Sequence, residues 1–216
     1  MSTFHVRYSN IVLPVLFLAA FILFPACKAR DTDAKQQSAN QEHEGHQQTN
    51  APKRYSRSIV AYTPPKVTLV DMTGAEVPLA SALNYEGPVL MQFIFTTCPT
   101  ICPVMSATFS TAQDKFGADL DRLRMISISI DPEHDTPARL REYAQKFKAK
   151  PQWQFLTGTL EDIVTVQKAF GVYRGNKMRH EPYTYLRASP HAPWVRLDGL
   201  MSASQLVAEY HKVISQ

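Results

Sequence analysis

Two cysteines stand four positions apart in the stretch FTTCPTICPVM, which runs from Phe95 to Met105, and each is followed directly by proline. Cysteine thiolates attack disulfides and bind soft metal ions, so Cys98 and Cys102 can form a redox pair or a metal clamp. A structural disulfide is the third interpretation, because such bonds are common in exported domains. A bridge over so short a loop constrains the unfolded chain least, and the two functional interpretations are therefore favoured.

A third ligand would separate metal binding from pure redox chemistry. Two thiolates suit Cu(I), and one imidazole completes a three-coordinate site. The chain has seven histidines, of which four lie in the N-terminal segments or inside the last predicted helix: His5, His43, His46 and His211. His134 lies in a loop near the expected site, and His180 and His191 are the main candidates. Spacing alone does not choose between His180 and His191.

The elements that position the cysteines follow from hydrophobic periodicity. PVLMQFIFTTC is a continuous apolar run of strand length, which is typical of a strand buried on both faces. After Cys102, apolar residues recur at helical spacing, and Pro103 suits the first helical position. Cys98 is therefore predicted just past a central strand and Cys102 at the start of a helix. Sites in open α/β sheets collect at such strand ends, and a helix N-terminus favours thiolate.

The rest of residues 59–216 alternates predicted strands and helices. Strands are predicted at RLRMISISID, WQFLTG, YTYLRA and APWVRLDG, and helices at TPARLREYAQKFKA, TLEDIVTVQKAFG and from about Ser202 to Ile214. The two last strands are expected to form a hairpin, and KVTLVDMTGAEVPL predicts an N-terminal β-hairpin. This order indicates the α/β class, as a sandwich with a mixed central β-sheet flanked by helices.

Residues 1–26 have the layout of an export signal. Arg7 precedes the apolar run IVLPVLFLAAFILF, which ends before Ala26 and Cys27. We expect a lipoprotein signal, with Cys27 acylated after cleavage. The alternative is an uncleaved anchor, since the run approaches the roughly 20 residues of a spanning helix. Both interpretations place the rest of the chain outside the cytoplasm, on the periplasmic side, and attach it to a membrane.

Residues 27–58 predict a flexible polar tether, because the segment lacks aliphatic residues larger than alanine. His43 and His46 within it could scavenge a metal ion, but a solvated linker is the favoured interpretation. The formal net charge of the chain is +4 and falls to +3 without residues 1–26, because Arg7 is the one charged residue there. So mild a charge predicts no nucleic-acid partner.

From about Val67 onward the chain resembles the Sco/SenC family of copper-binding, thioredoxin-like assembly factors for cytochrome c oxidase. FTTCPTICP is similar to the family's strand end and paired thiols, and SIDPEHDTP to its second block. In the third block a histidine precedes a Tyr-Leu strand, as His180 precedes Tyr185 and Leu186 here.

This resemblance implies a thioredoxin-like fold and a copper cofactor, as Cu(I) or Cu(II). It implies Cys98 and Cys102, which also form the redox pair, and His180 as the metal ligands. Asp131 is expected to serve the site indirectly, by orienting the cysteine loop or adding negative charge. For Asp135, a role in a turn and as a helix cap fits at least as well. Met105 is a soft donor, but its helical register with Phe109 favours core packing.

The resemblance also implies a function and partners. It predicts a membrane-tethered protein that delivers copper to, or keeps reduced the thiols of, the copper-site subunit of a respiratory cytochrome c oxidase, with a copper carrier protein as a further partner. The rival class is an extracytoplasmic thiol-disulfide oxidoreductase or peroxidase that needs no metal. Its usual redox spacing is C-x-x-C, one residue shorter than here. A copper chaperone with thiol-disulfide reductase activity is therefore favoured over a metal-independent enzyme.

Overall fold

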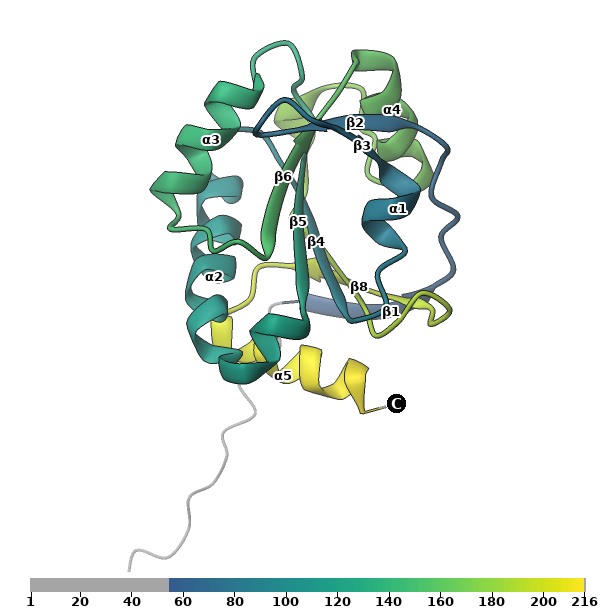
Figure 1. Cartoon of the computed structure of the whole chain (residues 1–216), viewed down its shortest axis with the longest axis vertical. Coiled ribbons are helices and arrows are strands. Elements are labelled where there is room, and N and C mark those ends of the chain that lie inside the picture. Colours follow the sequence, from purple (N-terminus) through teal and green to yellow (C-terminus); the bar gives the residue numbers. More distant parts are fainter. Residues whose placement is uncertain (1–54, 216) are drawn as a thin grey trace, which may run out of the picture. The chain divides into compact units, whose positions relative to one another are not determined.

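The computed structural model describes residues 55–215, which form an eight-stranded mixed sheet with helices on both faces (Figure 1). The strand order is β1-β8-β7-β4-β5-β6-β2-β3. The strands are β1 (Tyr55–Val60), β2 (Thr68–Asp71), β3 (Glu76–Pro78), β4 (Val89–Ile94), β5 (Arg124–Ser129), β6 (Trp153–Thr157), β7 (Tyr183–Arg187) and β8 (Trp194–Gly199). The helices are α1 (Leu79–Leu83), α2 (Ile101–Lys115), η1 (Gly117–Arg122), α3 (Pro137–Lys146), α4 (Leu160–Ala169), η2 (Lys177–Arg179) and α5 (Ala203–Ile214).

Strand β4 lies at the centre of the sheet, and all of its residues are buried. It runs parallel to β5, and β5 runs parallel to β6, so the carboxyl ends of these three strands lie at the same end of the sheet. The β4–β7 ladder is antiparallel and ends at Gln92, opposite Thr184. The loops that follow β4 and β5 therefore meet at the carboxyl ends of the strands, where sites in such sheets are built.

The helices cover the two faces of the sheet in pairs. Figure 1 shows α2 and α3 against one face and α1 and α4 against the other. Helix α3 begins as predicted, with the Thr136 side chain accepting a hydrogen bond from the Arg139 N–H and Pro137 at the first position. The predicted β2–β3 and β7–β8 hairpins and the closing helix are also confirmed.

The start of one helix and the presence of one strand differ from the sequence predictions. Helix α2 begins at Ile101, so Pro103 lies at the third helical position, where its missing N–H still needs no intrahelical partner. Strand β1 was not predicted at all. It pairs with β8 at the sheet edge and exposes most of its residues, so its sequence lacks the apolar alternation of a half-buried strand.

The N-terminal predictions lie mostly outside the described residues. The tether expected at 27–58 overlaps β1 at residues 55–58, so the folded domain extends further toward the N-terminus than expected. The predicted signal or anchor at 1–26 and the predicted acylation site Cys27 are not among the described residues. Within residues 55–215, every helix is too short or too polar to cross a membrane.

Candidate metal centre

The two cysteines lie where the sequence predicted them, just beyond β4 and in the first turn of α2. Both are free thiols; Cys98 is 7% exposed and Cys102 is fully buried. The Cys98 N–H donates to the Phe95 carbonyl at 3.2 Å, which folds the loop back on the strand end. The Cys102 N–H donates to Cys98 Sγ at 3.4 Å. The start of α2 therefore directs its backbone N–H groups at the sulfur of Cys98.

The two thiols have opposite electrostatic environments. Burial alone would raise the pKa of Cys98, but the backbone N–H groups of Cys102 and Thr100 outweigh it and leave that pKa below its ordinary value. Burial raises the pKa of Cys102 far above its ordinary value, and the negative charges of Cys98 and Asp135 raise it further. Cys98 is thus the thiol of the pair that loses its proton more readily, and Cys102 the one that keeps it.

Asp135, rather than Asp131, contacts the cysteine loop. Its buried carboxylate accepts hydrogen bonds from the Thr96 N–H at 3.1 Å, the Thr96 hydroxyl at 2.5 Å and the Ser129 hydroxyl at 2.6 Å. Thr136 is the helix cap, as its position before Pro137 predicted, so the alternative role of Asp135 as a cap is not observed. The contacts to the cysteine loop that were expected of Asp131 are thus made by Asp135.

Asp131 faces the histidine-bearing segment. Its buried carboxylate lies 2.5 Å from Lys177 Nζ and 3.2 Å from His134 Nδ1. Lys177 opens the η2 turn, which ends directly before His180. Sequence reasoning missed Lys177, because a single lysine in an irregular polar segment carries no periodic signal.

His180 is 9% exposed and packs against the end of β4. Its Nε2 lies 3.0 Å from the Phe93 carbonyl, which accepts, so Nε2 carries the proton and Nδ1 has the lone pair. Nδ1 is buried and finds no hydrogen-bond partner within residues 55–215. Burial lowers the His180 pKa to about 4, although the bond to Phe93 acts in the opposite direction. The imidazole is therefore neutral at neutral pH.

The other sulfur and imidazole candidates lie apart from this arrangement. His191 is exposed in the β7–β8 turn, and His134 is exposed beside Asp131. Met105 is buried on the core side of α2, together with Phe109, as its helical register predicted. Among the histidines of residues 55–215, His180 is the buried one, and its ring contacts the end of β4.

The three predicted ligands lie in two groups, which we call the cysteine half and the histidine half. Across residues 55–215, no three Cys, His, Asp or Glu side chains are grouped so that they could hold a metal ion. Both halves are nevertheless bonded to the end of β4, Cys98 through the Phe95 carbonyl and His180 through the Phe93 carbonyl. The rings of Phe95 and His180 also meet edge to face, with centroids 6.5 Å apart.

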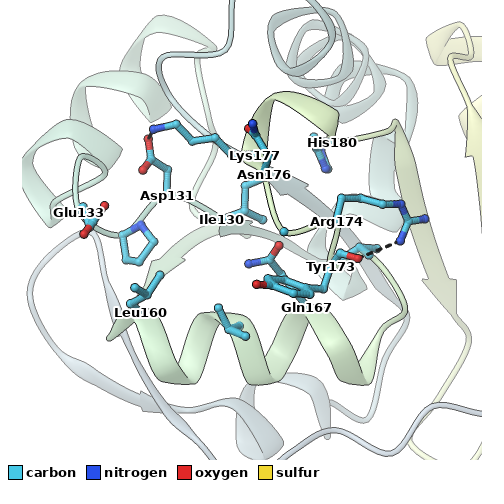
Figure 2. A pocket seen from close by; sticks show the side chains of 14 residues that line it. Ile130, Asp131, Glu133, Leu160, Gln167, Tyr173, Arg174, Asn176, Lys177 and His180 are labelled. Atoms are coloured by element: carbon cyan, nitrogen blue, oxygen red, sulfur yellow. Dashed lines mark hydrogen bonds and ion pairs between the residues drawn. The ribbon is translucent and has the colours of Figure 1, made fainter.

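A cavity of about 440 Å³ opens beside the histidine half (Figure 2). Figure 2 shows Lys177 extended toward Asp131 on one side of it and Arg174 near His180 on the other. Gln167 of α4 and Tyr173 contribute to its lining. His180 thus forms part of the wall of this cavity.

The family model described as SCO1/SenC matches residues 62–215, which is most of the chain. This chain belongs to the SCO1/SenC family. The SCO1 protein homolog of Bacillus subtilis (strain 168) is 41% identical over 93 residues, which are 42% of this chain and 47% of that protein. The matched segment thus spans about half the length of this SCO1/SenC relative.

Solved structures of the SCO1/SenC family have the same fold. Arabidopsis thaliana ScoI, solved with copper bound, is 28% identical, with a TM-score of 0.62 over 73% of this chain and 99% of that chain. BsSco, described as a member of the Sco family of cytochrome c oxidase assembly proteins with a disulfide switch, is 27% identical, with a TM-score of 0.61 over 73% of this chain and 96% of that chain. The predicted family and the thioredoxin-like α/β fold are confirmed.

Proposed function

We propose that Cys98, Cys102 and His180 bind copper, and that the chain supplies this copper to the copper-site subunit of a respiratory cytochrome c oxidase or keeps the thiols of that subunit reduced. Family membership supports the proposal, because Arabidopsis ScoI was solved with copper and BsSco is described as an assembly protein for this oxidase. A copper carrier protein is the proposed source of the metal.

The observation that carries the proposal is the unpartnered nitrogen of His180. Buried polar atoms normally have a hydrogen-bond partner, yet Nδ1 finds none in the described part of the chain. Histidines that bind metals commonly donate their other ring N–H to a carbonyl, as Nε2 does to Phe93. A neutral imidazole in this tautomer presents Nδ1 as a ready donor to a soft cation.

The donor set fits copper in its reduced state. Cu(I) supplies a soft, singly charged cation that prefers thiolate and imidazole ligands. Cys98 gives up its proton to a cation more readily than an ordinary cysteine, because its pKa is lowered. Cys102 keeps its proton until a cation is present, because a coordinated thiol is deprotonated outright. The buried charge of Asp135 disfavours the empty dithiolate and favours a bound cation.

The test is a copper titration of the full-length chain in detergent, with Cys27→Ser so that Cys98 and Cys102 are the only thiols. We expect one Cu(I) per chain under reducing conditions, with binding lost in Cys98→Ala. His180→Ala should weaken the affinity by roughly 10- to 100-fold. His191→Ala is the matched control and should leave it unchanged, while His134→Ala should matter less than His180→Ala. If His180→Ala binds as tightly as the parent chain, the proposed ligand set is wrong.

The unequal thiols also support a reductase role toward the client. The Cys98 thiolate would attack one sulfur of a client disulfide, which forms a mixed disulfide and releases one client thiolate. Cys102, after giving up its proton, would then attack Cys98 Sγ and release the second client thiol. The client gains two electrons, and the Cys98–Cys102 disulfide takes up the oxidation. Cys102→Ala should trap a client peptide on Cys98; no trapped adduct would exclude this order of attack.

We also propose attachment to the extracytoplasmic side of a membrane, through lipid on Cys27 or through an uncleaved anchor. The support is the sequence of residues 1–27. Mass spectrometry of the natively expressed protein distinguishes the two forms. A chain that starts at an acylated Cys27 supports the lipoprotein, and an intact N-terminus with unmodified Cys27 supports the anchor.

A further inference from the structure

The turn from Asp131 to Asp135 contacts both halves of the proposed site. Asp135 accepts hydrogen bonds from the N–H and hydroxyl of Thr96, two residues before Cys98. Asp131 accepts from Lys177 Nζ at 2.5 Å, in the turn that leads into His180. One short segment after β5 is therefore bonded to the cysteine loop by its last residue and to the histidine turn by its first.

The spacing of the two carboxylates is set by a closed set of hydrogen bonds. The Asp135 N–H donates to the Asp131 carbonyl at 2.9 Å, and the Asp131 N–H donates to Ser129 Oγ at 3.0 Å. The Ser129 hydroxyl in turn donates to the Asp135 carboxylate. All three side chains are buried, so water does not compete for these bonds.

Backbone hydrogen bonds within one turn connect Lys177 to His180. The His180 N–H donates to the Lys177 carbonyl at 3.0 Å, and the Asn176 side chain accepts from the Met178 N–H at 2.8 Å. Lys177 is 33% exposed, while its partner Asp131 is buried. Removing the lysine would leave a buried carboxylate with less compensation, so the pair resists opening more than an exposed pair does.

We propose that the Asp131–Asp135 turn is a bracket that sets the position of His180 relative to the cysteine loop, with Lys177 as the positioning residue on the histidine side. The inference rests on the proposed function, since it assumes that His180 and the cysteines bind one metal ion. The two halves must come together to enclose that ion, and restricting the histidine turn beforehand reduces the ordering entropy that binding requires.

The test uses Lys177→Gln in the full-length Cys27→Ser chain. We expect Cu(I) affinity to fall roughly tenfold, as for other residues that orient metal ligands, with faster copper release. The reduction potential of the Cys98–Cys102 pair should stay unchanged, because the substitution leaves the bonds of Asp135 to the cysteine loop in place. Arg179→Gln removes the same charge from an exposed residue of the same turn and should not change either quantity.

Three further variants make the result decisive. Lys177→Arg should retain most of the affinity, because the cation is kept. Asp131→Asn should lower the affinity as much as Lys177→Gln does. The double variant should bind no more weakly than either single variant, because each of them removes the same Lys177–Asp131 interaction. Additive losses, or unchanged or tighter binding in Lys177→Gln, would overturn the bracket. His180→Ala separates the two ideas: if it leaves affinity unchanged, the proposed ligand set fails and the bracket fails with it, whereas if it weakens binding and Lys177→Gln does not, the bracket alone is wrong.

Discussion

The two halves of the proposed copper site are built in different ways. The cysteine half follows a strand with every residue buried and runs directly into a helix, so regular backbone hydrogen bonding determines where its sulfurs lie. The histidine half lies between α4 and β7 on an irregular segment, and two side-chain contacts hold it, from Lys177 to Asp131 and from His180 to the Phe93 carbonyl. The comparison teaches that the fold determines one half, while a few polar contacts determine the other.

The charges of the two halves differ as well. Residues 96–113, around the cysteines, contain no Asp, Glu, Lys or Arg. Residues 168–179, before His180, contain only basic charges, namely Lys168, Arg174, Lys177 and Arg179. The thiols therefore respond to burial, backbone N–H groups and the buried Asp135, whereas the buried histidine is flanked by ion pairs that are partly open to solvent. Salt should affect the histidine half more than the cysteine half.

The largest expected effect is on the cysteine half, from Asp135→Ala. The substitution leaves the Thr96 N–H and the hydroxyls of Thr96 and Ser129 without their acceptor in a buried site, which should lower the free energy of unfolding by about 3–4 kcal/mol. Urea unfolding of the reduced protein measures this. A loss below about 1 kcal/mol would mean that the strand and helix hold the cysteine loop without Asp135.

The next effect is the response of the histidine half to acid. Burial lowers the His180 pKa to about 4 in the folded protein, against an ordinary value of 6.5, so the unfolded chain takes up the proton first as the pH falls. The metal-free protein should therefore lose up to about 3 kcal/mol of stability between pH 6.5 and pH 4, and none of this loss above pH 6.5. His180→Gln should remove this pH dependence. Parallel stability curves for the two proteins would contradict the buried neutral imidazole.

A smaller effect is expected when the ion pair between Lys177 and Asp131 on the histidine half is removed. Lys177→Gln should lower the free energy of unfolding by about 1 kcal/mol, since Lys177 is partly exposed and solvent screens part of the interaction. Raising the salt concentration should reduce the difference between the variant and the parent chain. A loss as large as that of Asp135→Ala would show that the two halves are held equally firmly.

The smallest effect is expected at Met178, which is 61% exposed on the η2 turn. Met178→Ala should change the free energy of unfolding by less than about 0.5 kcal/mol, because little apolar surface is lost from the interior. Copper affinity, measured in the same titration, should stay the same. A tenfold weaker affinity would mean that the thioether of Met178 contributes to copper binding on the histidine half.

The same contrast explains which parts of the fold and of the site could be predicted from the sequence. The apolar run of β4 and the periodicity of α2 predicted where both cysteines lie, because their surroundings are regular. The bond of Lys177 to Asp131 joins residues 46 positions apart through an irregular segment, and no local pattern indicates it. Asp131 and Asp135 share one turn, so which of them faces the cysteine loop depends on tertiary packing. Strand β1 was missed because an exposed edge strand can be polar.

The end of the β4–β7 ladder has a consequence for the chemistry of His180. Pairing with β7 stops at Gln92 and Thr184, one residue before Phe93, so a β7 strand bond does not take up the Phe93 carbonyl. The imidazole occupies this acceptor instead. The point where this ladder ends thereby selects the tautomer of a side chain outside both strands. One further pair, between Phe93 and Tyr183, would take up the acceptor and leave the ring free to present either nitrogen.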